Sequence, residues 1–108
     1  MANEKRAADT LHQRKIAGKA LQFVFDNHRR QQHRLDHLDL LQLFTDLFFD
    51  VSENLLLTLL QDLGERGYLS FKEEKNKDDE LRLRFIQITP AGRDIVRGFK
   101  KDDAVWIE

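Results

Sequence analysis

The side chains best suited to bind a metal ion lie close together in the first half of the sequence: His28, His33 and His37, with Asp36 and Asp39. Imidazole nitrogens and carboxylate oxygens are common metal ligands. If this segment were helical, His33 and His37 would lie on one face and could share an ion. Its polar residues instead indicate an extended connector, in which those two histidines stand about 13 Å apart. We therefore expect no metal site, and we expect His28 at the edge of the core.

The sequence offers no group of residues suited to covalent catalysis. It has 0 cysteines, and it contains neither a Gly-x-Ser-x-Gly motif nor a glycine-rich phosphate-binding loop. The carboxylates are spread over the polar faces of the expected helices and are not paired around apolar residues. We therefore expect a protein that is not an enzyme and that uses no cofactor.

The first expected element is a long helix, from about residue 7 to residue 30. When residues are placed at steps of about 100°, one arc of this helix is apolar. That arc holds Ile16, Ala17, Ala20, Leu21, Phe23 and Val24. Gly18 falls outside the arc and costs about 1 kcal/mol relative to alanine. Leu11 and Phe25 do not fit the apolar arc, which makes them candidates for an interface.

A helix-turn-helix pair is expected over about 38–66. Its first helix ends near Leu47, and Phe48 and Phe49 form the turn. The apolar face of that helix consists of Leu40, Leu41, Leu43, Phe44 and Leu47. In the second helix of the pair, which is the third of the chain, Ser52 is a suitable N-cap. The core face of this third helix consists of Leu56, Leu59, Leu60 and Leu63.

A β-hairpin over about 68–88 follows the third helix. Gly67 supplies the left-handed backbone conformation with which many helices end. The tip of the hairpin is strongly charged, and its returning strand is apolar from Leu81 to Ile88. The connector before the second helix can contribute a short third strand at Leu35.

The hairpin leads into a last helix over about 90–99, and the tail covers 100–108. Thr89 is placed to cap this helix. Pro90 stands at its first position, where the missing N–H does no harm.

Composition indicates a single globular domain in a reducing compartment. The chain has 108 residues, of which 41% are hydrophobic and 34% are charged. No apolar run approaches the roughly 18 residues that a membrane-spanning helix needs. The N-terminal residues lack the apolar region of a signal peptide. Because disulfides are excluded, we expect a cytoplasmic protein. Because no membrane-spanning run is present, we expect no membrane partner.

The net charge of −1 hides an uneven distribution. Residues 1–34 contain eight Lys and Arg against three Asp and Glu. Residues 35–66 contain one against seven, and residues 67–108 contain nine of each. The expected helix-turn-helix is therefore the acidic part of the chain.

The run Leu59-Leu60-Gln61-Asp62-Leu63-Gly64-Glu65-Arg66-Gly67-Tyr68-Leu69 is followed by the hairpin and by Ile88-Thr89-Pro90-Ala91-Gly92. This order resembles the winged helix-turn-helix domains of bacterial MarR-like and PadR-like transcriptional regulators. The resemblance implies a mainly helical α+β fold with a three-helix core, a small antiparallel hairpin wing and a C-terminal helix. It also implies dimerisation, and binding of double-stranded DNA through the third helix and the wing.

The side chains that could contact DNA lie on the outer face of the third helix and in basic positions elsewhere. Asn54 and Gln61 could bond adenine edges, and Thr58 could contact a thymine methyl group. Lys and Arg residues could hold phosphates, and these are Arg29, Arg30, Arg34, Lys75, Lys77, Arg82 and Arg84. The outer face of the third helix itself carries no Lys or Arg, so the alternative is a solvated polar face.

Several apolar residues remain outside the expected core. Strict alternation from Ile88 turns Leu81, Leu83 and Phe85 outward, whereas a β-bulge near Phe85 and Ile86 would bring such residues inward. Without a bulge, the candidates for a homodimer or partner interface are Leu11, Phe25, Leu57, Leu81, Leu83, Phe85 and Trp106.

Two functions follow from these patterns. The first is a winged-helix DNA-binding regulator that acts as a dimer. The alternative is a winged-helix module for protein–protein interaction, whose acidic, leucine-rich third helix does not bind DNA.

Overall fold

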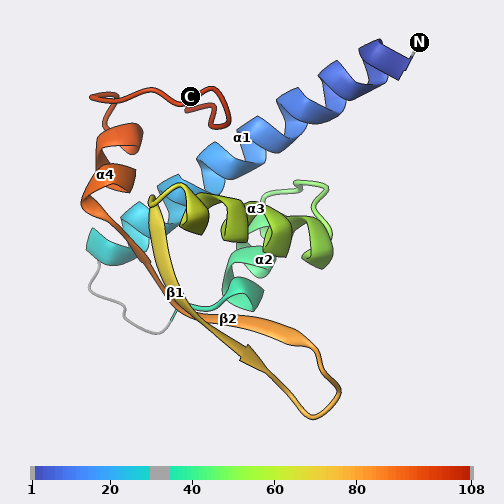
Figure 1. Cartoon of the computed structure of the whole chain (residues 1–108), viewed down its shortest axis with the longest axis vertical. Coiled ribbons are helices and arrows are strands. Elements are labelled where there is room, and N and C mark those ends of the chain that lie inside the picture. Colours follow the sequence, from blue (N-terminus) through green and yellow to red (C-terminus); the bar gives the residue numbers. More distant parts are fainter. Residues whose placement is uncertain (1, 30–34, 108) are drawn as a thin grey trace.

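The computed structural model describes residues 2–29 and 35–107, with side chains from 11 to 28 and from 35 to 107. Within this part the chain forms a mainly helical α+β fold, in which an antiparallel hairpin extends away from the helices (Figure 1). The elements are α1 (Ala2–Arg29), α2 (His37–Asp46), α3 (Glu53–Glu65), β1 (Leu69–Lys75), β2 (Leu81–Ile88) and α4 (Pro90–Val96). The order of elements is as predicted, although α1 begins earlier and α4 ends earlier than expected.

The apolar arc of α1 faces the core as predicted. Four of its side chains are at most 3% exposed and pack with the buried residues of α3 and β2. These are Ile16, Ala17, Ala20 and Leu21. Val24 is equally buried, and Phe23 is half-buried with its ring against that of Phe44. The long helix thus forms one wall of the core.

Helix α3 packs one face against the core and leaves the opposite face exposed. Ser52 caps its start, because the serine hydroxyl accepts the backbone N–H of Leu55. Its four core leucines are buried, which confirms the predicted face; they are Leu56, Leu59, Leu60 and Leu63. Gly67 ends the helix with φ +83, also as predicted.

The prediction for α2 is only half right. Leu40 and Phe44 are fully buried, but Leu43 and Leu47 are 39% and 51% exposed. The apolar face of α2 is wider than the surface that α3 and β2 cover. The surplus remains in contact with solvent.

The hairpin contains the β-bulge that was one of the two arrangements compatible with the sequence. Ser70 pairs with Gln87 and Lys72 pairs with Arg84, so Phe71 alone opposes two residues of β2. One of those two, Phe85, has φ +56. The bulge shifts the alternation of β2 and turns the residues before it inward.

Strict alternation would turn Leu81 and Leu83 outward, whereas the bulge turns both toward the core. Leu83 is fully buried, and Leu81 is half-buried against the core. Leu83 is removed from the proposed interface. At the predicted strand position Leu35, the described residues form one backbone hydrogen bond, in which Ile86 N–H donates to the Leu35 carbonyl at 2.9 Å.

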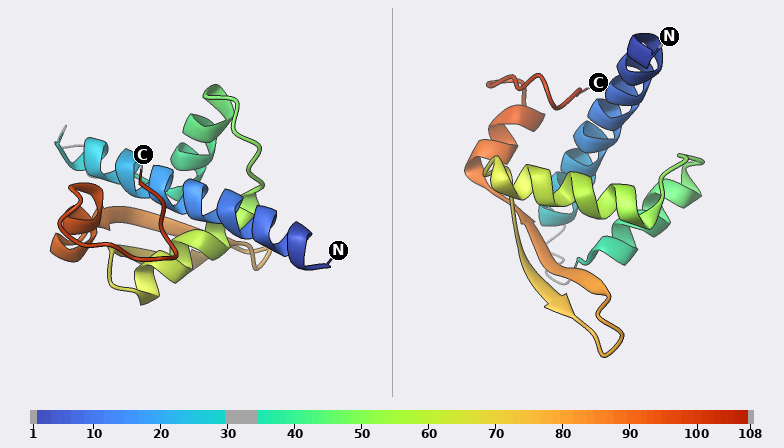
Figure 2. Two further views of the ribbon diagram at one scale, coloured as in Figure 1. Left: turned by 90° about the horizontal axis from the view of Figure 1, so that it is seen from above. Right: turned by 45° about the vertical axis from the view of Figure 1, so that its right-hand side comes forward.

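The C-terminal tail returns along α1 (Figure 2). The backbone N–H of Trp106 donates to the Arg14 carbonyl at 3.0 Å. A Cβ atom at Gly18 would lie 1.8 Å from the Trp106 carbonyl oxygen, so only glycine permits this contact. Gly18, which counts against the helix in the sequence, is thus the place where the tail approaches α1.

Asp102 anchors the same tail to the end of α3. Its carboxylate accepts the Tyr68 hydroxyl, the Arg66 guanidinium and the N–H of Ala104. The hydrogen bond from Tyr68 is the main reason that the pKa of Asp102 lies below its ordinary value.

Candidate functional site: the groove between α3 and the hairpin

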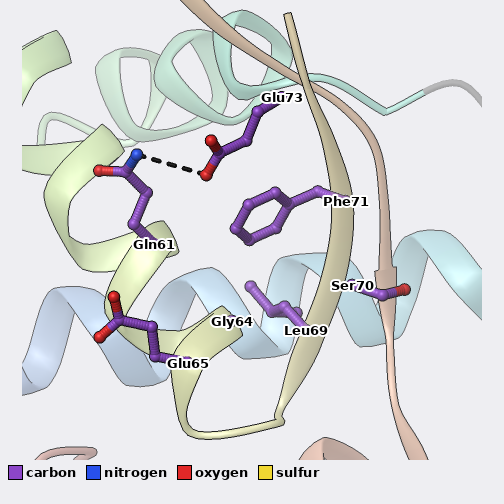
Figure 3. A pocket seen from close by; sticks show the side chains of 7 residues that line it. All are labelled: Gln61, Gly64, Glu65, Leu69, Ser70, Phe71 and Glu73. Atoms are coloured by element: carbon purple, nitrogen blue, oxygen red, sulfur yellow. Dashed lines mark hydrogen bonds between the residues drawn. The ribbon is translucent and has the colours of Figure 1, made fainter.

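An open groove of about 450 Å³ lies between α3 and β1 (Figure 3). Side chains from both elements reach into it from opposite sides. The lining residues are Gln61, Gly64 and Glu65 of α3 and Leu69, Ser70, Phe71 and Glu73 of β1. Both elements are fixed by the core, so the groove has a defined shape.

The floor of the groove is apolar because of a glycine. A Cβ atom at Gly64 would lie 2.7 Å from the Phe71 ring, so the aromatic ring rests on the bare backbone of α3. Phe71 remains half-buried beside the buried Leu69. The groove thus offers apolar surface at its base.

The rim of the groove is polar and negatively charged. The carboxylates of Glu65 and Glu73 are exposed on opposite sides of the groove (Figure 3). The Gln61 amide nitrogen donates to Glu73 Oε1 at 3.5 Å. The nearby cation Arg66 is engaged at 2.8 Å by Asp62 and at 3.2 Å by Asp102. Positive charge from a binding partner would therefore be favoured here.

The hairpin cations predicted to hold phosphates are paired with carboxylates. Arg82 contacts Asp36 at 2.7 Å, Arg84 contacts Glu74 at 3.3 Å and Lys75 contacts Asp79 at 3.5 Å. Hydrogen bonding by Arg84 holds the pKa of the Glu74 carboxyl below its ordinary value. Such exposed pairs are individually weak, but together they neutralise the hairpin.

Lys77, at the hairpin tip, is the exception. No ion pair of Lys77 occurs among the residues that the structure describes. Arg30 and Arg34 lie outside the described residues, and so does the side chain of Arg29. The structure therefore does not place the predicted basic cluster relative to α3.

The predicted base-reading residues do share the outer side of α3. Asn54 and Thr58 are exposed, and the Thr58 hydroxyl donates to the Asn54 carbonyl at 2.9 Å. Gln61 is half-buried in the groove and bonded to Glu73. Two of the three residues therefore face solvent, while the third contributes to the groove rim.

The remaining interface candidates do not form one patch. Phe85 lies on the hairpin and is 41% exposed, whereas Leu11 and Trp106 lie along α1 and are 38% and 42% exposed. Phe25 and Leu57 are half-buried against the core. The sequence missed the most exposed large apolar side chain of the described chain, Phe48, which is 96% exposed.

His37, which the sequence pattern indicated only as a possible metal ligand, has a structural role. It is 1% exposed. Its Nδ1 accepts the backbone N–H of Leu83 at 3.2 Å, so the ring proton resides on Nε2, which donates to Glu53 at 2.9 Å. Both nitrogens are occupied, and the ring joins α2, α3 and β2.

The described histidines give no support to a metal centre. His28 is exposed on α1, and His33 lies outside the described residues. Within the described chain, no group of three or more His, Cys, Asp or Glu side chains could hold an ion. The helices described there also include none with the length and apolar character required to cross a bilayer.

The sequence matches no protein-family model, and it has no significant match among curated proteins.

Proposed function

We propose that this chain is a winged helix-turn-helix module that binds a basic segment of a partner protein. In this assignment α1, α2 and α3 form the three-helix core, the β1–β2 hairpin is the wing, and α4 completes the domain. The order of elements, the caps at Ser52 and Thr89 and the packing of α3 under the hairpin support the assignment.

The distribution of charge around α3 is the observation that carries this function. Glu65 and Glu73 line the groove, and the outer face of α3 carries no Lys or Arg. A DNA-binding surface needs cations in these places, because phosphate neutralisation supplies most non-specific affinity. Carboxylates there favour a positively charged polypeptide.

The groove suits a lysine or arginine in an extended or helical segment. The aliphatic part of such a side chain would lie on Phe71 and Leu69, while its charged end would meet Glu65 and Glu73. The Phe71 ring would add a cation–π contribution. A basic partner segment gains both burial and charge pairing in one place.

An NMR titration tests this function. A lysine-containing peptide should shift the signals of Gln61, Glu65, Phe71 and Glu73, while its glutamate-substituted counterpart should not. The double variant Glu65→Gln and Glu73→Gln should weaken binding about tenfold, because two charge contacts are lost. Glu80→Gln, which removes an exposed hairpin carboxylate outside the groove, is the matched control. Equal binding by the double variant and the control would exclude the groove.

Binding of double-stranded DNA is the second candidate. The exposure of Asn54 and Thr58 on α3 favours it, and so does Lys77 at the hairpin tip, which has no ion pair within the described residues. It requires the ion pairs of Arg82 and Arg84 to open so that both can contact phosphates. The module would then act as a cytoplasmic, dimeric transcription regulator.

A salt titration with mixed-sequence duplex DNA separates the two functions. DNA binding predicts an affinity that falls steeply with salt, and a smaller salt dependence when Arg82 and Arg84 become alanine. Absence of binding at low salt would leave the protein-binding function alone.

A further inference from the structure

Among the residues that the structure describes, three helices end with the same backbone motif. At the end of α3, Gly67 N–H donates to the Gly64 carbonyl and Tyr68 N–H donates to the Leu63 carbonyl. At the end of α4, Gly98 and Phe99 make the equivalent bonds. In this Schellman motif the residue after the C-cap takes a left-handed conformation, which favours glycine. Gly67 and Gly98 have φ +83 and φ +80.

The end of α2 has the same motif with phenylalanine in the glycine position. Phe48 has φ +60, and its N–H donates to the Thr45 carbonyl at 3.0 Å. Phe49 N–H donates to the Phe44 carbonyl at 2.9 Å, and the rings of Phe44 and Phe49 pack with their centroids 5.6 Å apart. The motif is therefore complete.

The Phe48 side chain is not buried within one copy, so its burial does not compensate for the unfavourable backbone conformation of this residue. It is 96% exposed, whereas the two glycines at the equivalent positions avoid the steric cost. The strained backbone and the exposed aromatic ring are both accounted for if the ring contacts something outside the monomer.

The surroundings of Phe48 extend this apolar surface. Leu43 of α2 and Leu47, the C-cap of this helix, lie one turn apart and are 39% and 51% exposed. We call Leu43, Leu47 and Phe48 the Phe48 patch. Asp46 and Asp50, both exposed, stand on either side of Phe48 in the chain. The exposed apolar residues of the patch are therefore followed and interrupted in the chain by exposed carboxylates.

A hollow with two lysines is lined by Phe49, the residue that follows Phe48. It has a volume of about 40 Å³ and is lined by Lys15, Lys19, Gln22, Phe49 and Trp106. The Lys15 ammonium lies 5.9 Å from the centre of the Trp106 ring. Phe49 directly follows Phe48 in the chain and lines this Trp106 hollow, and the His12 imidazole of α1 contacts the Asp50 carbonyl at 3.2 Å, so the turn that carries Phe48 lies against α1 next to the hollow.

We propose that the Phe48 patch and the Trp106 hollow form a self-complementary interface between two copies of this chain. In a two-fold dimer, the same surface of each copy contains both halves of the contact. The edge of the Phe48 ring of one copy meets the Trp106 hollow of the other. Asp46 and Asp50 then face Lys15 and Lys19 of the second copy. This dimer leaves the α3 groove untouched and does not depend on the function proposed above.

The oligomeric state of a Phe48 variant tests the interface first. Sedimentation equilibrium on the whole chain, up to about 1 mM protein, should show a dimer for the natural sequence. Phe48→Asn keeps a residue that tolerates the left-handed conformation and removes the ring. It should raise the dimer dissociation constant at least about 30-fold. Phe99→Asn, at another exposed phenylalanine, should leave that constant unchanged.

Charge exchange then distinguishes a second copy from any other partner. The double variant Lys15→Glu and Lys19→Glu should be monomeric, and so should Asp46→Lys and Asp50→Lys. An equimolar mixture of the two double variants should recover the dimer, because both halves of the contact become complementary again.

The following outcomes would overturn the proposal. One is a natural chain that remains monomeric at the highest concentration, and another is a Phe48→Asn variant that dimerises as tightly as the natural chain. A fall in the thermal midpoint of dilute, monomeric Phe48→Asn would also overturn it, since Phe48 would then serve the fold of the single copy. Failure of the mixed charge variants to associate would exclude the two-fold arrangement.

Discussion

Helices α2 and α3 are both rich in leucine, yet only α3 buries the apolar face that its sequence defines. Helix α3 lies among α1, α2 and β1, and its four core leucines are covered. Helix α2 is covered from one side, and Leu43 and Leu47 remain exposed. The same periodicity therefore has two meanings. Where other elements cover the helix on both sides, the periodic leucines are core residues. Where they do not, some of these leucines remain on the surface and are available for association.

The largest effect expected from this difference is on stability. Leu60→Ala in α3 should lower the free energy of unfolding by about 2–5 kcal/mol, because it leaves a cavity in the core. Leu47→Ala in α2 should change it by less than about 0.5 kcal/mol in dilute, monomeric samples. Urea unfolding of both variants measures the difference. Similar losses in the two variants would contradict the distinction.

The contact that joins the two helices gives the next largest effect. His37→Ala should cost about 1–3 kcal/mol, because the Leu83 N–H loses its acceptor in a buried place. Amide hydrogen exchange at Leu83 should accelerate in this variant. Glu53→Gln retains an acceptor for His37 Nε2–H and serves as the milder control. Unchanged exchange at Leu83 would show that the histidine does not hold β2.

The ends of the two helices should respond in opposite directions to substitution. Gly67→Ala, after α3, should cost about 1 kcal/mol. This cost would come from the backbone alone, since nothing lies within 4 Å of the added Cβ. Phe48→Gly, after α2, relieves the same strain and should not lower the thermal midpoint of the monomer. If the thermal midpoint of Phe48→Gly falls as much as that of Gly67→Ala, the two helix ends do not differ in backbone strain.

The starts of the two helices differ in their response to pH. Helix α2 is capped by Asp36, whereas α3 is capped by Ser52, which does not titrate in this range. Burial by itself raises the pKa of Asp36, but the hydrogen bonds from Arg82 and from the Asp39 N–H outweigh it, so the pKa is lowered in the folded state.

A lowered carboxyl pKa stabilises the fold above the unfolded value and loses this contribution as pH falls. The stability supplied by Asp36 should therefore be complete above about pH 5 and decline below the unfolded pKa of 3.8. Asp36→Asn keeps a capping side chain and should remove this decline, a change of less than about 1 kcal/mol. Urea unfolding at pH 6, 4 and 3 measures the slope. A slope equal to that of the natural chain would exclude Asp36 as its source.

The parts of the fold that were predictable are those that depend on neighbours in sequence. The caps at Ser52 and Thr89 and the left-handed Gly67 each bond to backbone groups within a few residues. The groove was only partly foreseen. Gln61 was singled out for its position on α3, but its partner Glu73 is twelve residues away across the turn.

Contacts between distant residues explain what was missed. His37 bonds to Leu83, 46 residues later, and no local pattern indicates that pairing. In the sequence Gly18 indicates a weak point of a helix, whereas in the structure the C-terminal tail packs against it. The exposure of Phe48 was equally hidden, because a turn between two apolar helices gives no sign of which side the core covers.

The order of the helices and strands, the caps at Ser52 and Thr89 and the inward face of α3 could be predicted from the amino acids alone, since they follow from side-chain periodicity and hydrogen bonds within a few residues. The bulge at Phe85, the burial of Leu83 and the acidic groove beside Phe71 became known only from the folded chain. Those features depend on how separate elements pack. The free energy that selects among such packings comes from contacts between residues far apart in the chain.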